Sequence, residues 1–269
     1  MHFLILGRPR CRTSFVCDVL GNLHDASNFH ESFDNTDQIK NQVIRSKLTK
    51  VQNLQNRVLE VQKKHCTKIT NDVFNEKNAV IKLFTRHLVY PSDSIKEQFF
   101  EHKNYPYFFN KIDQPHFLTI TDYIDIFQFK RYDEIFFLDR DLVTSTLSYV
   151  FNILVMKSPL YSSENQIKVL KQKNITITVE ENLYPYINFY VYEYIIQTQI
   201  KKDLQNSNIK FTELNYDDCI PYITNRFNKM PVSKFSDTKL DYSKIITNYS
   251  EIQDYINQTY TTLSKHHIH

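Results

Sequence analysis

Three arginines are crowded into one short turn near the start of the chain, directly behind one of its two glycines. Residues 7–14 read GRPRCRTS, with Arg8, Arg10 and Arg12 alternating ahead of two hydroxyl residues. Guanidinium groups are permanently charged, fork-shaped donors that bind oxyanions such as phosphate and sulfate. The residue types and their spacing therefore indicate an anion-binding loop.

The elements around this turn suit such a loop. Residues 2–7, HFLILG, predict a short buried strand of a parallel sheet, and the apolar spacing from Thr13 to Leu23 predicts a helix that Thr13 or Ser14 caps. A strand that ends in a tight turn and opens a helix directs backbone N–H groups and the positive end of the helix dipole at one spot. That spot accepts phosphate or sulfate.

The loop differs from the one that binds ATP and GTP, which reads G-x-x-x-x-G-K-[ST]. Gly7 takes the first glycine position and Ser14 the final hydroxyl, but Arg12 replaces the second glycine and Thr13 replaces the lysine. We also find no convincing acidic residue on a second strand to hold Mg²⁺. Charge neutralisation is therefore expected to fall to the arginines.

A second strand and helix repeat this arrangement in the stretch FFLDRDLVTSTLSY. Arg140 ends the apolar run, and Ser148 lies eight positions later, about two helical turns at ~1.5 Å per residue. Ser145, three positions before Ser148, shares its helix face. The pair Arg140 and Ser148 could therefore hold a second phosphate beside the first.

Together these stretches resemble the sulfotransferases that use 3′-phosphoadenosine 5′-phosphosulfate. Residues 9–14, PRCRTS, match the family pattern P-[RK]-S-G-T-[ST], and the stretch from Arg140 to Tyr149 matches R-x-x-x-x-x-x-x-S-Y. The stretch IKFTELNYDDCI resembles the family's late strand and helix, commonly R-Y-E-D-L. The resemblance covers most of the chain in outline.

The resemblance implies a single domain over residues 1–269, of the P-loop nucleotide-kinase-like sulfotransferase fold, a three-layer α/β/α arrangement with a central parallel sheet. It also implies that Arg140 and Ser148 bind the 3′-phosphate, and that sulfuryl transfer to a hydroxyl or amine acceptor needs no metal. The first loop would bind the 5′-phosphosulfate through Arg8, Pro9, Arg10, Cys11, Arg12, Thr13 and Ser14.

Sulfuryl transfer needs a base for the acceptor proton and cations on the migrating group. The resemblance implies Glu31, in NFHESF after the first helix, as the base, with Arg10 and Lys82 as further catalytic residues. Lys82 lies inside the apolar run VIKLF, so it is expected to point towards an anion rather than remain unpaired. His87, just past that run, is an alternative base.

The rest of the chain alternates strands with helices, which predicts a parallel sheet covered on both faces. Residues 156–180 are the expected exposed excursion, because their polarity is high and their periodicity weak. Further strands are expected within residues 78–85, 132–140 and 209–216, and helices within residues 35–65, 92–102, 141–156, 183–204 and 250–263.

Composition excludes several other classes of protein. A net charge of +3 is too small to indicate nucleic acid, and no run is long and apolar enough to span a membrane. The four cysteines fit neither a zinc spacing nor a disulfide framework, and no signal peptide is evident, so we expect a cytoplasmic protein. The identity of the acceptor and the oligomeric state cannot be read from the sequence.

Two other functions stay open. A non-catalytic relative could bind a nucleotide or a partner without transfer, and it is favoured by Cys11 and Arg12, which stand where the family has serine and glycine. A small-molecule kinase would bind ATP with Mg²⁺, but the missing loop lysine argues against it.

Overall fold

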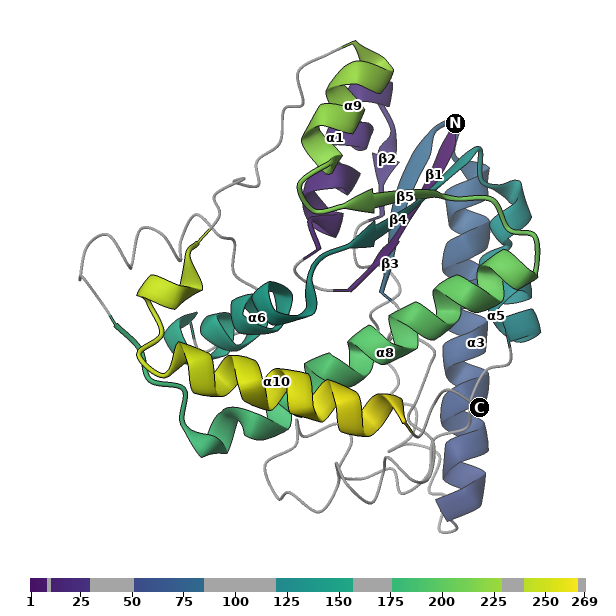
Figure 1. The fold of residues 1–269 in the computed structure, drawn as a ribbon. Coiled ribbons are helices and arrows are strands. Elements are labelled where there is room, and N and C mark those ends of the chain that lie inside the picture. The colour runs from purple at the N-terminus through teal and green to yellow at the C-terminus, as the bar shows by residue number, and fades with distance from the viewer. Residues whose placement is uncertain (9–10, 30–50, 85–119, 157–175, 229–239, 266–269) are drawn as a thin grey trace.

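The protein has a five-stranded sheet in which all strands run parallel, in the order β2-β3-β1-β4-β5. The computed structural model describes residues 1–8, 11–29, 51–84, 120–156, 176–228 and 240–265. Figure 1 shows the strands side by side with helices around them. The strands are β1 (His2–Gly7), β2 (Ser27–Asn28), β3 (Ala79–Phe84), β4 (Glu134–Asp139) and β5 (Thr212–Asn215).

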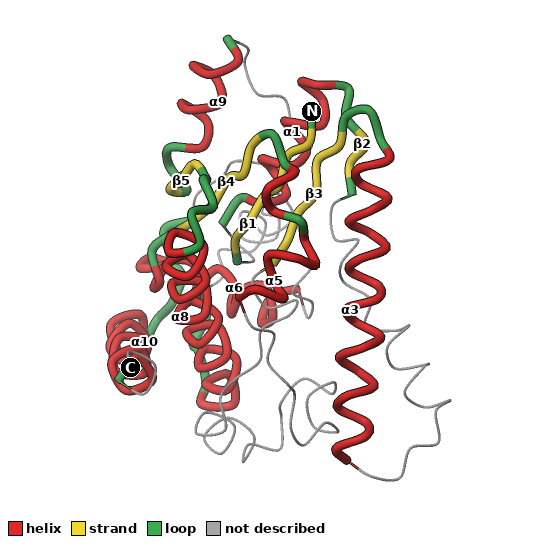
Figure 2. Tube along the Cα trace, turned by 90° about the vertical axis from the view of Figure 1, so that its right-hand side faces the viewer, coloured by secondary structure: helices red, strands yellow, loops and turns green. Residues whose placement is uncertain are grey.

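Helices cover both faces of this sheet (Figure 2). Leu4 and Leu6 of β1 join a core with helices on one face, whereas Phe3 and Ile5 join a second core on the other. The first face carries α3 (Val51–Asn75), α5 (Ile120–Phe127), α6 (Leu142–Met156), α8 (Tyr184–Asn206) and α10 (Tyr249–Ser264). The second face carries α1 (Thr13–His24) and α9 (Cys219–Phe227). Short 3₁₀ turns lie at η3 (Phe129–Arg131), η4 (Glu181–Leu183) and η5 (Tyr242–Lys244).

The expected α/β class and the parallel sheet are confirmed, because alternating side chains of apolar strands fill two cores. Helix α3 runs ten residues past the expected end at His65, since buried Cys66 and Val73 continue its apolar stripe. In the described part of the chain no helix is both long and apolar enough to cross a membrane. The expected helix at 92–102, most of the 156–180 excursion and the start of the 35–65 helix lie outside the described residues.

Among the strands and α-helices, β2 and α5 are not expected from the sequence, and α9 is expected only through the family resemblance. Strand β2 has only two residues, which show no period, and it forms because Ser27 and Phe29 donate backbone hydrogen bonds to Asn78 and Val80. Helix α5 packs against α3, and no strand or helix had been assigned to its residues. The only indication of helix α9 in the sequence is the resemblance of IKFTELNYDDCI to the late strand and helix of the sulfotransferase family.

Gly7 ends β1 at a point where the chain has no room for a side chain. A Cβ atom there would lie 2.8 Å from Thr13 Cγ2 and 3.0 Å from the backbone oxygen of Leu138. The turn therefore folds directly back against the end of β1, and the first residue of α1 packs where a Cβ would lie. This close approach brings the start of α1 next to β4.

We expect Gly7→Ala to lower the free energy of unfolding by about 1–3 kcal/mol, the usual cost of overpacking. Adding Thr13→Ser, which removes Cγ2, should recover part of that loss, because the clash with Leu138 remains. Gly21→Ala is the control, since its Cβ would come no closer than 3.3 Å to the side chain of Asn28. Urea unfolding measures all four proteins, and a Gly7→Ala variant as stable as the unaltered protein would contradict the steric argument.

Candidate anion-binding site

The carboxyl ends of β1, β3, β4 and β5 meet at one edge of the sheet, where α1 and α6 also begin. Open α/β sheets bind ligands at this edge. Most of the described site residues expected from the sequence gather here, on the loop after β1, the loop after β4 and the strand β3.

Lys82 brings a cation to the start of α1. It pairs with Ile5 in the sheet, its side chain is 1% exposed, and its Nζ donates a 2.8 Å hydrogen bond to Ser14 Oγ. Ser14 is the second residue of α1, so the ammonium lies at the first turn of a helix, whose backbone N–H groups have no intrahelical partners. The neighbouring strand β3 therefore brings a lysine to the start of α1, where the loop itself has Thr13 in place of a lysine.

Arg12 immediately precedes α1 in a left-handed conformation, with φ 64° and ψ 13°. That conformation costs a residue with a side chain about 1–2 kcal/mol. The side chain has compensating contacts, because its guanidinium carbon lies 3.8 Å from the centroid of the Tyr216 ring and its Nη1 donates to the Tyr216 carbonyl. Arg12 thus takes the backbone geometry that glycine favours and holds it through its side chain.

Arg140 packs against the same ring. Its guanidinium carbon lies 4.0 Å from the Tyr216 centroid, and the residue is 9% exposed. Tyr216 follows β5 directly, and Asn215 pairs with Asp139, so the tyrosine lies beside the residue after β4. Sequence reasoning missed Tyr216 as a site residue, because its position beside Arg140 follows only once β4 and β5 are known to be neighbours.

Arg8 differs from its expected role at the phosphosulfate. Its side chain is completely buried and bonds inside the protein: Nε donates to Gln197 Oε1 at 2.9 Å, and Nη2 donates to Asp139 Oδ1 at 3.0 Å. Nη1 donates to Ser145 Oγ at 3.2 Å, and Nη2 also donates to the Arg140 carbonyl at 2.9 Å. Burial acts to lower the pKa of Arg8, but the surrounding groups, Asp139 among them, outweigh it and raise the pKa above its ordinary value, so the guanidinium stays charged.

Asp139 ends β4, next to β1, where an acidic residue could have served Mg²⁺. The sequence analysis did not recognise it as such a residue. Its Oδ1 accepts hydrogen bonds from Arg8 Nη2 at 3.0 Å and from the backbone N–H of Arg140 at 2.8 Å, and its charge is balanced by Arg8. Among the described residues no group of three or more histidine, cysteine, aspartate or glutamate side chains could hold a metal ion.

The two serines of α6 have different surroundings. Ser145 faces Arg8 and donates to the Asp141 carbonyl at 2.7 Å, so it belongs to the internal network. Ser148, one turn further on, is 6% exposed, and within the described part of the chain its hydroxyl makes no hydrogen bond. Ser148 therefore lies outside the hydrogen-bond network of Arg8.

Of the other expected site residues, two are buried in the protein and four lie outside the residues that the structure describes. Thr13 is 3% exposed and its methyl group packs over Gly7, and Cys11 is fully buried. Burial raises the pKa of the Cys11 thiol, so Cys11 is a neutral packing residue in the loop. Outside the described residues lie Pro9, Arg10, Glu31 and His87.

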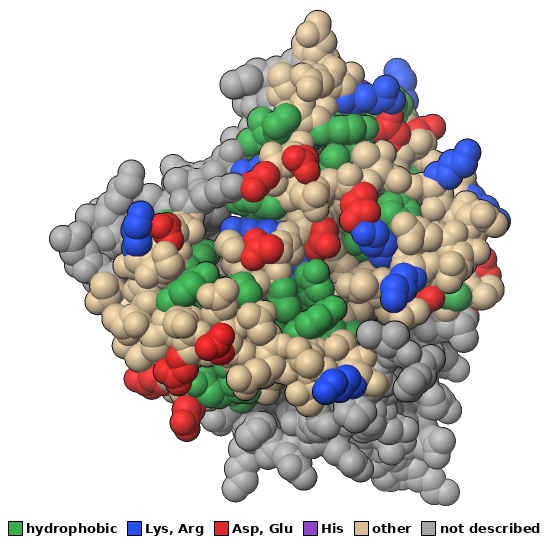
Figure 3. Space-filling view, in the orientation of Figure 1, with side chains coloured by type: hydrophobic (Ala, Val, Ile, Leu, Met, Phe, Trp, Pro, Cys, Tyr) green, Lys and Arg blue, Asp and Glu red, His purple; other side chains and the backbone are tan. Residues whose placement is uncertain are grey.

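Three exposed acidic residues of the described chain lie close in sequence to Arg140 and Tyr216. Asp141, Asp217 and Asp218 are exposed, whereas Arg140 is buried behind them. Figure 3 shows acidic side chains at the surface near the turn into α9 and the start of α6, with basic side chains recessed between them.

No family model, curated protein or solved structure matches this chain. Its function therefore has to be inferred from the chemistry of the carboxyl edge.

Replacing Arg8 with methionine should lower the free energy of unfolding by about 1.5–3 kcal/mol or more, because Asp139, Gln197 and Ser145 lose hydrogen bonds to a charged group. Arg8→Lys should also be costly, since one ammonium cannot reach Gln197, Ser145 and Asp139 together. Urea unfolding measures both. Arg226→Met is the control: its own side chain is 54% exposed in the ion pair with Glu134, whereas that of Arg8 is fully buried, so its unfolding midpoint should move much less. A small effect of Arg8→Met would show that the network adds no stability.

The buried thiols should make stability fall at high pH. Burial raises the pKa of Cys66 and of Cys219 to about 12, whereas unfolded thiols ionise near pH 8.5. Between about pH 8.5 and pH 12 the thiols ionise in the unfolded state but stay protonated in the folded state. The free energy of unfolding is therefore highest below about pH 8.5 and falls by ~1.4 kcal/mol per thiol for each pH unit as the pH rises towards 12. Urea unfolding at about pH 8 and pH 10 measures this slope, which should be shallower in Cys66→Ala. Equal stability at both values would contradict it.

Proposed function

We propose that the protein is a sulfotransferase that binds 3′-phosphoadenosine 5′-phosphosulfate at the carboxyl edge and transfers the sulfuryl group to a hydroxyl or amine acceptor. The observation that carries this proposal is the Lys82 ammonium at the N-terminus of α1, 2.8 Å from the Ser14 hydroxyl. A cation, a hydroxyl and the first backbone N–H groups of a helix converge there, as an oxyanion requires.

In this proposal the phosphosulfate lies against the start of α1. Lys82 and Ser14 hold its oxygens, and the first-turn N–H groups complete the cradle. Arg10 of the same loop is the further cation for the migrating group. Arg8 takes a supporting role instead of touching the anion, because its donors bind Asp139, Gln197 and Ser145.

The 3′-phosphate is proposed to lie between Arg140 and Ser148. Arg140 follows β4 and Ser148 is on α6, so both belong to the loop and helix beside the first site. Arg140 is held against the ring of Tyr216, which limits the orientations that its guanidinium can take. A pre-positioned guanidinium loses less freedom when a phosphate binds.

The proposed reaction is an in-line displacement on sulfur. The acceptor oxygen or nitrogen forms a bond to sulfur, the bond from sulfur to the bridging oxygen breaks, and adenosine 3′,5′-bisphosphate leaves. The acceptor proton passes to a base, for which Glu31 and His87 are the candidates. The catalytic contribution of the protein is positioning and charge neutralisation by Arg10 and Lys82.

The non-catalytic alternative has its own support. Cys11 is buried and neutral, so it gives the anion no hydroxyl, and Arg12 is engaged with Tyr216. Such a protein would bind the nucleotide and transfer nothing. The kinase alternative is disfavoured, because Asp139, the acidic residue at the end of β4, is paired with Arg8.

We expect calorimetric titration with adenosine 3′,5′-bisphosphate, without magnesium, to give micromolar binding. Arg140→Ala and Lys82→Met should each weaken it at least about tenfold, since a hydrogen bond to a charged group contributes ~1.5–3 kcal/mol. Lys202→Ala is the matched control, because Lys202 is exposed on α8 and should not affect binding. Urea unfolding of each variant shows whether it remains folded.

Each outcome selects one function. Absence of bisphosphate binding would overturn the donor site, and tighter binding of ATP with Mg²⁺ would favour a kinase. Bisphosphate binding with no release of bisphosphate from the phosphosulfate donor, across hydroxyl and amine acceptors, would favour the non-catalytic relative.

A further inference from the structure

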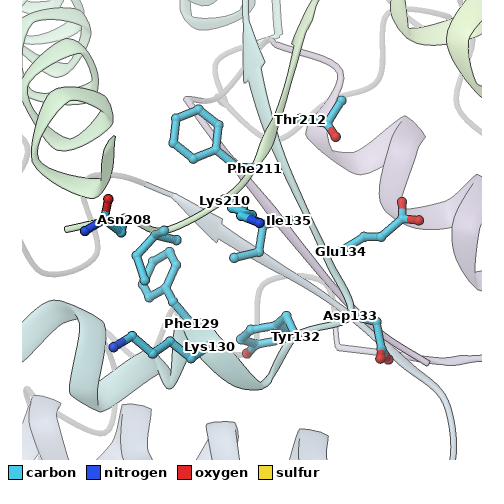
Figure 4. Close-up of a pocket in the computed structure, with 11 residues that line it drawn as sticks. Phe129, Lys130, Tyr132, Asp133, Glu134, Ile135, Asn208, Lys210, Phe211 and Thr212 are labelled. Carbon is cyan, nitrogen blue, oxygen red and sulfur yellow. The ribbon is translucent and has the colours of Figure 1, made fainter. Parts of the chain in front are cut away.

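Charged side chains line both edges of the sheet, in different arrangements. In the hollow at the amino ends of β4 and β5, Figure 4 shows Lys130 pointing away from the carboxylates of Asp133 and Glu134. At the carboxyl edge, in contrast, two guanidinium groups lie within 4.0 Å of the centroid of one ring, that of Tyr216. Tyr216 is therefore a point at which side chains from the ends of three strands meet.

Arg12 connects this ring to the start of α1. The Arg12 carbonyl accepts a 3.0 Å hydrogen bond from the backbone N–H of Val16, the first hydrogen bond of the helix. Its left-handed conformation is unfavourable for a residue with a side chain. The ring of Tyr216, 3.8 Å from the guanidinium carbon, and the Tyr216 carbonyl hold the side chain in place. The position of the first turn of α1 therefore depends on Tyr216 through Arg12.

Arg140 connects the same ring to the second subsite. The backbone of Arg140 is fixed, because its N–H donates to Asp139 Oδ1 at 2.8 Å and its carbonyl accepts from Arg8 Nη2 at 2.9 Å. Its guanidinium carbon lies 4.0 Å from the Tyr216 centroid, and the residue is 9% exposed. The ring therefore restrains the side chain that the proposed function assigns to the 3′-phosphate.

We propose that Tyr216 is a positioning residue that couples the two anion subsites, because one ring restrains both Arg140 and, through Arg12, the start of α1. The inference rests on the proposed function for the identity of the two bound groups, a 5′-phosphosulfate and a 3′-phosphate. Groups that are oriented before binding lose less freedom when the ligand arrives. Removal of the ring should therefore weaken binding at both subsites, although Tyr216 follows a different strand from either.

Calorimetric titration of the whole chain with adenosine 5′-monophosphate and adenosine 3′-monophosphate tests the two subsites separately. Tyr216→Leu keeps the carbonyl and removes the ring, so it should weaken binding of each nucleotide at least about fivefold. Tyr216→Phe keeps the ring and should bind both as the unaltered protein does, because the hydroxyl makes none of these contacts. Tyr222→Leu is the matched control, since Tyr222 is also half-buried but packs on Phe136, with 6.1 Å between ring centroids.

A double variant separates this role from a direct contact between the ring and adenosine. Glycine adopts the left-handed conformation without strain, so Arg12→Gly removes the connection to Tyr216 and leaves the turn its geometry. Adding Tyr216→Leu to Arg12→Gly should then weaken adenosine 5′-monophosphate no further. A further loss of about fivefold would overturn the proposal, because the ring would be touching the nucleotide itself. Unchanged affinity for this nucleotide in Tyr216→Leu alone would also overturn it.

Urea unfolding without nucleotide tests the connection between Tyr216 and Arg12 independently of the proposed function. In the unaltered protein Arg12→Gly relieves backbone strain but loses the ring contact, whereas in Tyr216→Leu it only relieves the strain. The unfolding midpoint should therefore change more favourably on Arg12→Gly in the Tyr216→Leu protein, and equal changes would overturn the connection. Unequal changes together with no binding of either nucleotide to the unaltered protein would overturn the donor site of the proposed function, and the coupling of its subsites, but not the connection.

Discussion

The carboxyl edge depends on one buried cation, the guanidinium of Arg8. It is fully enclosed and donates to groups on β4, α6 and α8, which fixes the end of β1 against all three. The rings of Tyr190 and Tyr194 also contact it, with their centroids 5.3 Å and 4.4 Å from its carbon. A buried charge is tolerable only when its donors are satisfied, so these partners are fixed together.

This network keeps the charge of Arg8 inside the protein. Arg8 donates its hydrogen bonds inside the protein. Its positive charge neutralises the carboxylate of Asp139, which would otherwise be an unpaired negative charge beside the loop. Lys82, Arg12 and Arg140 bring three further cationic side chains to the same edge. The candidate anion site is thus bordered by an arginine whose donors are used inside the protein, in an ion pair with Asp139.

Much of the architecture was predictable, because it depends on local patterns. The runs HFLILG and EIFFLD are apolar enough to be buried strands, and strands that alternate with helices give a parallel sheet whose carboxyl ends share one edge. The approach of Lys82 to the loop also follows from a lysine inside a buried strand. The expected base, Glu31, lies outside the described residues, so its role stays a prediction.

The inward direction of Arg8 could not be predicted in this way. Its partners Asp139 and Gln197 lie 131 and 189 positions away along the chain, and a strand-end arginine can face either solvent or core. The same holds for Tyr216, which is 204 positions from Arg12. These contacts are set by strand order and helix packing, which single-sequence patterns do not contain.

A phosphate-binding loop usually uses glycine both for a positive φ and for close packing of the backbone. In this chain, which has two glycines, different residues meet these two requirements. Neither glycine has a positive φ, whereas Arg12, Asp25, Gln128, Asn208 and Asn228 all do. At Arg12 the requirement is conformational, and a side chain can meet it when a partner such as Tyr216 offsets the strain. At Gly7 the requirement is space, because Thr13 and the Leu138 carbonyl occupy the place of a Cβ, and no side-chain contact can supply that. A glycine that is needed only for a positive φ can therefore be replaced by another residue, as at Arg12. Gly7 cannot, because the turn packs against the position of its Cβ.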